Sequence, residues 1–287
     1  MKLAIISGKG GTGKTTIAVS ILELEKGSLS VDADVDASNM HLFYNGVDIE
    51  KEYFSGSSIA KVNEDLCINC GKCNEVCRFD AIDKGIVNKL KCEGCGACEI
   101  VCPNKAITLE KEKSADIYTT KTSSGYMVRA DMEIGAEGSG LIISRLRKKA
   151  NEYKSETNLT ILDGSPGIGC SVISSITNND LVLIVTEPTK SGKEDFKRVY
   201  QLTKHFNIPA LACINKYDIN NKMSIEIENY CKSENIPLVG KIPFDNMIID
   251  SINNLKPIVY YENSIANKAI RSMWSKIKKD YLKEGER

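Results

Sequence analysis

Eight of the eleven cysteines in this chain fall into two copies of one spacing. In each copy two residues separate the first three cysteines, and three residues precede the fourth. The first run is Cys67, Cys70, Cys73 and Cys77, and the second, 25 residues further on, is Cys92, Cys95, Cys98 and Cys102. A segment this rich in cysteine and glycine cannot build a useful apolar core, so we expect groups bound by the cysteines to hold it together.

The spacing is typical of bacterial ferredoxins, in which the fourth cysteine of each run ligates the cluster of the other run. It therefore predicts two [4Fe-4S] clusters. The first would be held by Cys67, Cys70, Cys73 and Cys102, and the second by Cys92, Cys95, Cys98 and Cys77. A short internal repeat supports the reading, since Gly71, Ala81 and Ile82 recur as Gly96, Ala106 and Ile107. We read residues 60–110 as a small inserted α+β domain of the ferredoxin-like kind.

Cysteine-rich chains are often secreted disulfide scaffolds, but the pattern here argues against that class. Met1 and Lys2 lead directly into an apolar strand without a signal-peptide pattern, and the apolar runs are too short to cross a bilayer. Metal-ligand spacing fits a reducing compartment, so we expect a cytoplasmic protein. With 38 basic and 38 acidic residues the formal charge is zero, and we expect no nucleic-acid partner. The apolar face of the C-terminal helix, 262–283, is better explained by packing than by membrane binding.

A glycine-rich segment near the N-terminus predicts a phosphate-binding loop. It runs from Gly8 to Thr15, after the apolar strand Leu3–Ile6 and before a helix from Thr15 to about Lys26. Backbone N–H groups of such a loop surround phosphates at a helix N-terminus. We expect Lys14 to reach the β- and γ-phosphates and Thr15 to ligate Mg²⁺. The expected nucleotide-binding residues are Gly8, Lys9, Gly10, Gly11, Thr12, Gly13, Lys14, Thr15 and Thr16, together with Asn215.

The rest of the chain predicts an α/β fold with a doubly wound, mostly parallel sheet. Further strands are expected at Ser28–Val31, Leu159–Leu162, Leu181–Val185, Ala210–Ile214 and Leu238–Ile242, with helices at about 192–206, 222–234 and 262–283. Strands that alternate with helices indicate this architecture. The nucleotide-binding domain would comprise 1–59 and 111–287, with a β-hairpin within 117–133.

Three polar residues follow or end predicted strands. Asp163 is placed to provide oxygen to Mg²⁺. Of the acids after the second strand, we expect Asp34 rather than Asp32 to orient the attacking water. Asn215 can read the exocyclic amine of adenine, although its Asn-Lys-Tyr-Asp context also resembles a guanine-reading motif.

The combined motifs resemble the MinD/ParA/nitrogenase-iron-protein group of ATPases, and in particular a branch with an inserted ferredoxin domain. The resemblance rests on a second lysine, Lys9, in the phosphate loop and on four further stretches: Val31–Asn39, Asp163–Gly167, Glu187–Thr189 and Asn215–Lys216. It implies ATP as the nucleotide and a doubly wound ATPase fold. It also implies a nucleotide-dependent, face-to-face homodimer, or a heterodimer with a related ATPase. In that dimer Lys9 would reach the partner's nucleotide, and Lys9, Lys14 and Asp34 would be the catalytic residues.

The chain departs from its relatives at two places. Arg78, not proline, follows Cys77, whereas Pro103 follows Cys102. Related sequences often carry a lysine in a glycine-rich stretch that corresponds to Gly135–Leu141, and this chain has none there. Cys170 lies seven residues after Asp163, close to the offset of a cluster ligand in the nitrogenase iron protein. The second cysteine that such a bridging cluster needs is absent, so we expect a small packing residue or a transient contact there.

The leading hypothesis is a Mg²⁺-dependent ATPase whose nucleotide state gates electron transfer from the two clusters to a redox partner or a metallocofactor. One alternative is an ATPase that assembles or delivers an iron–sulfur or related cofactor. A second is a positioning or partition ATPase, which has no use for eight cluster ligands. In a third alternative the two clusters only stabilise the fold.

Overall fold

The computed structural model describes residues 1–136, 138–154, 157 and 159–282, and these form two compact units. The first comprises Met1–Lys51, Ile117–Ala130 and the chain from Ser139 onward. The second comprises Glu52–Asp116 and Asp131–Gly138. The second unit is thus wider than the predicted insertion of 60–110. Its paired strands extend beyond the cysteine runs on both sides, and the segment 131–138 also belongs to it.

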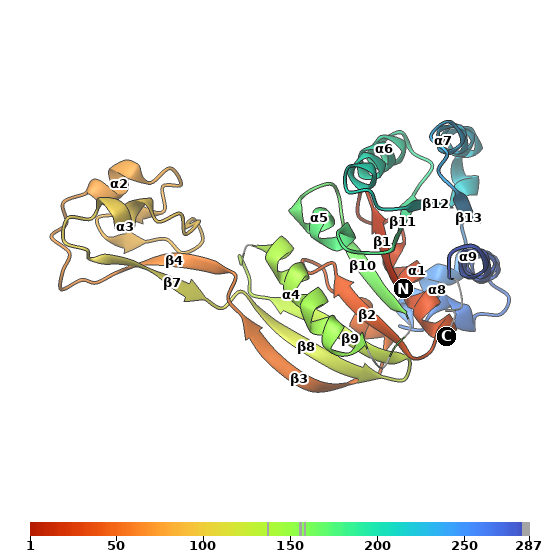
Figure 1. Ribbon diagram of the computed structural model, residues 1–287, viewed down its shortest axis with the longest axis horizontal. Helices are drawn as coiled ribbons and strands as arrows, with labels where there is room; N and C mark the ends of the chain where they lie inside the picture. The colour runs from red at the N-terminus through yellow and green to blue at the C-terminus, as the bar shows by residue number, and fades with distance from the viewer. Residues whose placement is uncertain (137, 155–156, 158, 283–287) are drawn as a thin grey trace. The chain divides into compact units, whose positions relative to one another are not determined.

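A nine-stranded sheet organises the first unit in the order β13-β12-β11-β1-β10-β2-β9-β8-β3 (Figure 1). The seven strands from β13 to β9 run parallel to their neighbours. The bounds are β1 Lys2–Ser7, β2 Ser28–Ala33, β3 Val47–Phe54, β8 Ala115–Thr122, β9 Gly125–Met132, β10 Thr160–Pro166, β11 Leu181–Thr186, β12 Ala210–Asn215 and β13 Leu238–Ile242. The predicted mostly parallel sheet and the predicted hairpin, which is β8 and β9, are confirmed.

Helices cover both faces of this sheet (Figure 1). They are α1 Lys14–Leu24, α4 Ser139–Glu152, α5 Cys170–Ile176, α6 Lys190–His205, α7 Asn221–Ser233, α8 Met247–Asn253 and α9 Ile265–Tyr281. Short 3-10 turns are η1 Met40–Phe43, η3 Tyr217–Asn220 and η4 Ile258–Tyr260. Strand residues that alternate in β1, such as Leu3 and Ile5, pack in one cluster with Ile17 of α1 and Trp274 of α9. The apolar face of the C-terminal helix is therefore part of the core.

The second unit is built on an internal repeat. It contains β4 Ser57–Val62, α2 Lys72–Val76, β5 Ile82–Asp83, β6 Ile86–Val87, α3 Ala97–Val101 and β7 Ile107–Glu112. The antiparallel pair Val62↔Ile107 of β4 and β7 recurs, at the 25-residue shift, as the pair Ile82↔Val87 of β5 and β6.

Backbone geometry follows the same repeat. The N–H of Asn63 donates to the carbonyl of Ala106, and that of Asn88 donates to the carbonyl of Ala81, both at 2.7 Å. Left-handed φ angles recur at Asp80 and Lys105, at 47° and 49°. The structural repeat is thus longer than the few identical residues that indicated it in the sequence.

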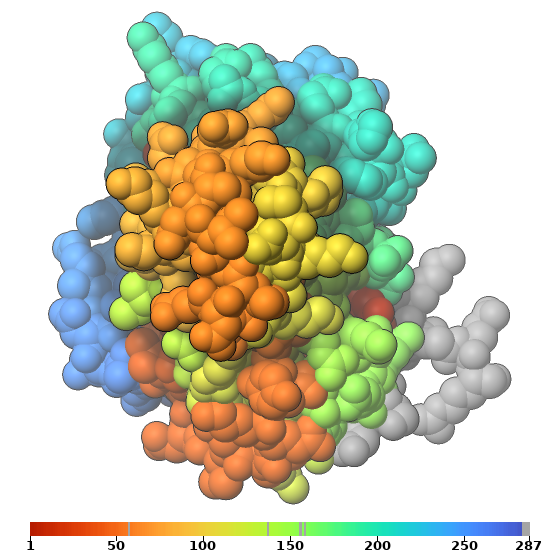
Figure 2. All heavy atoms as spheres, turned by 90° about the vertical axis from the view of Figure 1, so that its left-hand side faces the viewer, coloured from red at the N-terminus to blue at the C-terminus, as the bar shows by residue number. Residues whose placement is uncertain are grey.

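The second unit has little apolar core. Its buried apolar cluster consists of Ala60, Ile82 and Ile107, and several cysteines pack against it. Large apolar side chains stay exposed, among them Ile86 (77%), Leu90 (80%) and Ile100 (83%). In Figure 2 the atoms of this unit are coloured mainly from orange to yellow. Within the described part of the chain, no helix is both long enough and apolar enough to span a bilayer.

Candidate nucleotide site and cysteine pockets

The phosphate-binding loop connects β1 to α1, and its glycines are required by its geometry. Gly11 and Gly13 have left-handed φ angles of 76° and 88°. A Cβ atom on Gly13 would lie 2.4 Å from Nδ2 of Asn215, which is closer than any real contact. That amide donates to the carbonyl of Thr12 at 2.8 Å. Asn215, at the end of β12, therefore holds the loop in shape, and its role in reading the base stays a prediction.

Lys14 and Asp34 lie together at the start of α1. The Lys14 side chain is only 5% exposed, and its Nζ lies 3.7 Å from Oδ2 of Asp34. Burial raises the pKa of Asp34, and the charge of Lys14 opposes this rise. The carboxylate that sequence reasoning chose for positioning water is therefore beside the lysine expected to contact the phosphates.

Thr15 and Asp163, the predicted magnesium ligands, are in direct contact. Oγ1 of Thr15 donates to Oδ2 of Asp163 at 2.5 Å. The other carboxylate oxygen of Asp163 is buried and has no hydrogen-bond partner among the residues that the structure describes. Burial raises the pKa of Asp163 to about 7, against the effect of Lys14. An unsatisfied carboxylate oxygen beside a threonine hydroxyl fits Mg²⁺, which takes one or two protein oxygens and completes its shell with water and phosphate.

Asp32 has a different environment from Asp34, although it lies near the end of β2 and Asp34 directly follows that strand. Its Oδ2 accepts hydrogen bonds from Oγ of Ser38 (2.9 Å) and from the backbone N–H groups of Asn39 (3.1 Å) and Met40 (3.0 Å). The side chain is fully buried, and this burial raises its pKa to about 6. Asp32 therefore orders the chain after β2, while Asp34 remains closer to the phosphate loop.

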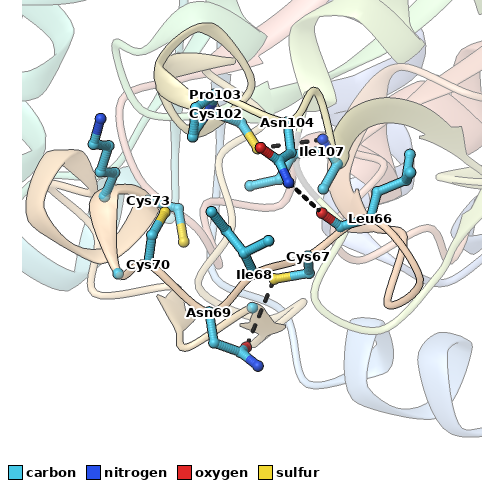
Figure 3. A pocket seen from close by; sticks show the side chains of 14 residues that line it. Leu66, Cys67, Ile68, Asn69, Cys70, Cys73, Cys102, Pro103, Asn104 and Ile107 are labelled. Atoms are coloured by element: carbon cyan, nitrogen blue, oxygen red, sulfur yellow. Dashed lines mark hydrogen bonds between the residues drawn. The ribbon is translucent and has the colours of Figure 1, made fainter.

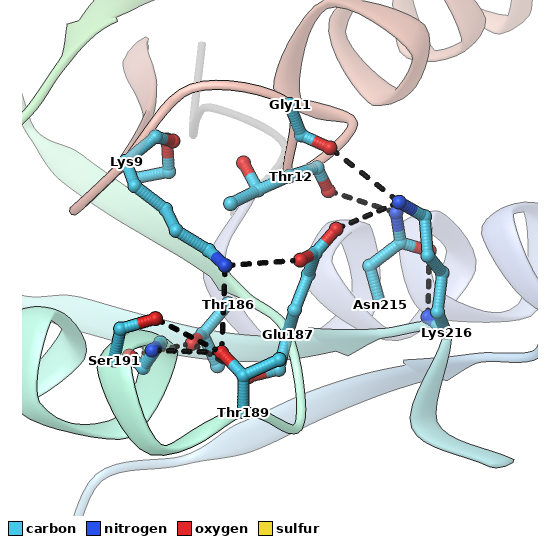
Figure 4. A network of polar contacts seen from close by, with 11 residues as sticks. Lys9, Gly11, Thr12, Thr186, Glu187, Thr189, Ser191, Asn215 and Lys216 are labelled. Carbon is cyan, nitrogen blue, oxygen red and sulfur yellow. Dashed lines mark hydrogen bonds and ion pairs between the residues drawn. The ribbon is translucent and has the colours of Figure 1, made fainter. Parts of the chain in front are cut away.

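Lys9, the second lysine of the loop, is paired within its own subunit (Figure 4). Its Nζ lies 3.3 Å from Oε2 of Glu187, and the other oxygen of Glu187 accepts a hydrogen bond from Nζ of Lys216 at 2.7 Å. Lys9 also donates to Oγ1 of Thr189 at 3.4 Å. Sequence reasoning assigned no role to Glu187, because nothing in its local pattern indicates that two distant lysines converge on it.

The eight cysteines of the second unit line two pockets, four in each. Cys67, Cys70, Cys73 and Cys102 line the first, which is lined also by Leu66 and Ile68 (Figure 3). Cys77, Cys92, Cys95 and Cys98 line the second. Each pocket thus combines three cysteines of one run with the fourth cysteine of the other run. This is the grouping expected from the spacing.

Backbone N–H groups point at several of these sulfur atoms. Ala106 donates to Sγ of Cys102 at 3.2 Å, and its repeat counterpart Ala81 donates to Sγ of Cys77 at 3.3 Å. Ala60 of β4 donates to Sγ of Cys92 at 3.5 Å. Such bonds favour negatively charged sulfur, as in a cluster-bound thiolate. Ala81 and Ala106 are both buried, at equivalent places in the repeat.

The donor set fits a cluster better than a single ion. Among the described residues, no group of three or more histidine, cysteine, aspartate or glutamate side chains is placed to hold one metal ion. A four-iron cluster binds each cysteine through a different iron atom, so its ligands surround a cavity instead of converging on a point. Four cysteines around each pocket, with N–H groups directed at their sulfur atoms, satisfy that requirement.

Three cysteines lie outside these pockets. Cys170 is exposed at the start of α5, so the expectation of a packing residue there is wrong, whereas Cys213 and Cys231 are buried. Glu137, within the glycine-rich stretch that lacks a lysine, lies outside the described residues.

Comparison with known proteins gives the family and the fold of this chain. Residues 3–258 match the family described as the CobQ/CobB/MinD/ParA nucleotide binding domain. The chain belongs to this family. A solved structure of a related fold is the septum site-determining protein MinD of Pyrococcus horikoshii OT3 in complex with Mg-ADP. It superposes with a TM-score of 0.62 at 20% identity, over 98% of this chain and 96% of that one, and this likeness shows the fold.

Two relatives within the CobQ/CobB/MinD/ParA family cover nearly the whole chain. The uncharacterized protein MJ0578 of Methanocaldococcus jannaschii is 38% identical over 282 residues, which are 97% of this chain and 96% of the relative. The iron-sulfur cluster carrier protein of Pyrococcus horikoshii is 25% identical over 295 residues, which cover 96% of this chain and 85% of the relative.

Proposed function

We propose that this protein is a Mg²⁺-dependent ATPase whose nucleotide state gates electron transfer from two [4Fe-4S] clusters to a partner protein or metallocofactor. One observation carries the proposal. A single chain combines a phosphate loop with a Thr15–Asp163 pair and two pockets that are each lined by four cysteines. ATP hydrolysis at the phosphate loop and electron transfer by clusters can each occur without the other. Their presence in one chain therefore favours a protein that couples the two processes.

The nucleotide half is assigned residue by residue. The loop from Gly8 to Thr16 surrounds the phosphates, and Lys14 offsets the charge on the β- and γ-phosphates. Thr15 and Asp163 would hold Mg²⁺, which would withdraw charge from the phosphates. Asp34 orients the water for in-line attack. The bond that breaks joins the γ-phosphorus to its bridging oxygen, so the products are ADP and phosphate.

A nucleotide-dependent dimer is part of the proposal. Lys9, the second lysine of the phosphate loop, would cross to the partner's nucleotide in a homodimer or in a heterodimer with a related ATPase. The family assignment and the position of Lys9 in the motif support this step. Because the γ-phosphate is lost on hydrolysis, the dimer would form with ATP and separate with ADP.

The cluster half follows from the two pockets. One cluster would be held by Cys67, Cys70, Cys73 and Cys102, and the other by Cys77, Cys92, Cys95 and Cys98. Ferredoxin-type clusters carry one electron each, and hydrogen bonds to their sulfur atoms tune their potentials. The N–H groups of Ala60, Ala81 and Ala106 are the groups in this chain that would do so.

The chain itself provides a route between the two halves. The segment that carries Asp163 leads into α5, and α5 is joined to α4 because the guanidinium of Arg147 donates to the carbonyl of Ser174 at 2.7 Å. Helix α4 begins at Ser139, directly after the segment 131–138 that belongs to the second unit. In that unit, Gly135 and Ala136 line a cavity of about 230 Å³ together with Leu90 and Cys92. Movement at the phosphate site would therefore be passed along the chain to the start of α4, where the first unit is connected to the second.

A second candidate function is the assembly or delivery of an iron–sulfur cofactor. It is favoured by the relatives from three Pyrococcus species that are named iron-sulfur cluster carrier proteins, at about 25% identity. Two complete sets of four cysteines argue against it, because a fully ligated cluster is difficult to release. In that case the clusters would still be able to supply electrons for assembly.

The experiment is anaerobic isolation followed by linked measurements on one preparation. We expect about eight irons per chain, ATP hydrolysis that needs Mg²⁺, and an affinity for nucleotide that differs between oxidised and reduced protein. The variant Lys14→Ala should abolish hydrolysis and leave the iron content unchanged. Equal nucleotide affinity in both redox states would contradict gating. Transfer of iron to an apo-protein, with loss of iron from this chain, would favour the delivery function.

A further inference from the structure

Glu187 connects three neighbouring elements of the sheet edge that carries the phosphate loop. It directly follows β11, which lies between β1 and β12 in the sheet. Lys9 comes from the loop after β1, and Lys216 directly follows β12. Because parallel strands end at the same edge, one carboxylate after the central strand can meet a lysine from each side. Figure 4 shows this arrangement.

The carboxylate that the two lysines share is more buried than either lysine. The Glu187 side chain is 12% exposed, whereas Lys9 and Lys216 are 32% and 31% exposed. A carboxylate this buried is costly without a positive partner. Each of its oxygens has one, since Oε2 faces Lys9 and Oε1 faces Lys216.

Other contacts fix the two lysines in this position. Lys9 is also held by Thr189, whose hydroxyl is itself fixed because it accepts the N–H of Gly192 at the start of α6. Lys216 has a left-handed φ of 52°, and its Nζ lies 3.5 Å from the carbonyl of Gly11. The Lys216 amine is therefore also anchored to the phosphate loop at Gly11, whereas the Lys9 amine contacts Glu187 and Thr189.

We propose that Glu187 is a positioning residue that retains Lys9 within its own subunit and thereby sets the threshold for ATP-dependent dimerisation. This inference rests on the dimer of the proposed function. The Lys9 amine cannot pair with Glu187 and reach a partner's phosphate at the same time, so the dimer forms only when that ion pair breaks. Lys216 makes the exchange feasible, because it keeps the buried Glu187 neutralised after Lys9 has left.

Substitutions at Glu187 and at Lys216 should change the dimer dissociation constant in opposite directions. In Glu187→Gln the amine of Lys9 loses its charged partner, so the dimer dissociation constant should fall by about threefold to tenfold. In Lys216→Met the full charge of Glu187 faces Lys9 and would be left unpaired on its departure, so the same constant should rise. Glu226→Gln is the matched control, because Glu226 pairs with Lys193 at 2.8 Å away from the loop. It should leave the constant unchanged.

The measurement is sedimentation velocity of the complete, cluster-loaded protein with a saturating non-hydrolysable ATP analogue and Mg²⁺. Saturation removes any effect of the variants on nucleotide affinity, and affinity is measured separately on dilute monomer. We expect Glu187→Gln to bind the analogue as the wild type does. If both variants weaken the dimer, or neither changes it, Glu187 does not restrain Lys9. A wild type that stays monomeric would instead contradict the dimer of the proposed function, and this inference with it.

Discussion

At the scale of single residues, the nucleotide site depends on carboxylates that burial keeps out of water. One carboxylate oxygen of Asp163 accepts a hydrogen bond from Thr15, and the other has no hydrogen-bond partner among the described residues. Burial of this oxygen costs free energy in the nucleotide-free protein, and a bound cation would offset that cost. The change Asp163→Asn removes the negative charge and keeps the shape. Magnesium-dependent ATP hydrolysis should fall by about tenfold to a hundredfold or more, as measured by phosphate release.

The control for this prediction is the binding of ADP without metal, measured by calorimetry. It should be almost the same in the wild type and in Asp163→Asn, because the phosphate loop is intact. A variant that hydrolyses ATP at the wild-type rate would exclude Asp163 as a magnesium ligand.

Asp32 leads to a prediction about pH. Its folded-state pKa is about 6, and its unfolded pKa is about 3.9. A raised acid pKa stabilises the fold at low pH, and this stabilisation is lost as the pH rises through about 6. Without nucleotide, the free energy of unfolding of the wild type should therefore fall more steeply between about pH 4 and about pH 6 than that of Asp32→Asn, because in this range the carboxyl is ionised in the unfolded chain and still protonated in the folded one. Denaturant titrations under anaerobic conditions measure both slopes, and equal slopes would contradict the assignment.

Several site residues were predictable from sequence, and others were not. Lys14, Thr15 and Asp163 stand at fixed offsets within motifs, so the expectation that they converge needed only the order of the strands. The pairing of Lys9 and Lys216 through Glu187 depends on the lengths of two loops and on the left-handed backbone of Lys216. Neither follows from residue type. Asn215 also donates a hydrogen bond to the carbonyl of Thr12. This contact could not be predicted from sequence, because it depends on where the sheet places the end of β12 relative to the loop after β1.

At the scale of elements, close approach to β4 distinguishes two glycines of the second unit. Gly94 and Gly71 both have left-handed backbone, at φ 60° and 76°. A Cβ atom on Gly94 would lie 2.1 Å from the carbonyl oxygen of Ser58 in β4, whereas one on Gly71 would meet nothing within 4 Å. Gly94→Ala should therefore displace the second cysteine run from β4, and Gly71→Ala should only strain a turn.

Iron analysis after anaerobic reconstitution distinguishes these two variants. Gly94→Ala should lose iron toward about four atoms per chain, while Gly71→Ala should stay near about eight. Equal iron content in both would show that contact with β4 does not support the second cysteine pocket.

The elements that could be predicted from sequence are those with a clear apolar periodicity. Helices were expected at 192–206, 222–234 and 262–283, and α6, α7 and α9 begin and end within a few residues of these limits. The helices α4, α5 and α8 were not expected, and α5 and α8, of seven residues each, are too short to show a full apolar stripe. No strand was expected over Val47–Phe54, because β3 is an edge strand whose residues are mostly exposed and half of them charged. Its pairing with β8 is decided by tertiary contact and not by local preference.

At the scale of the whole molecule, a net charge of zero conceals a division between the two units. The second unit carries fourteen acidic and nine basic residues, a net charge of −5, so the first unit carries +5. Two oxidised clusters with their thiolates would add about −4 to the second unit. Electrons would thus leave through a strongly acidic part of the chain, which favours a redox partner with a basic surface.

Salt dependence tests this charge division. Oxidation of the reduced protein by cytochrome c, which is basic, should slow as ionic strength rises, because salt screens the attraction. Oxidation by the anion ferricyanide should become faster under the same change. Stopped-flow absorbance measures both rates, and two rates that respond to salt in the same direction would contradict the prediction.

The central claim is that the nucleotide site and the clusters act as one device, and the most direct test is the cluster potential in each nucleotide state. An EPR-monitored redox titration of the anaerobic protein should give different midpoint potentials with a non-hydrolysable ATP analogue and with ADP. A tenfold coupling corresponds to about 59 mV for one electron, and Lys14→Ala should abolish the difference. Identical potentials with the analogue, with ADP and without nucleotide would contradict the claim.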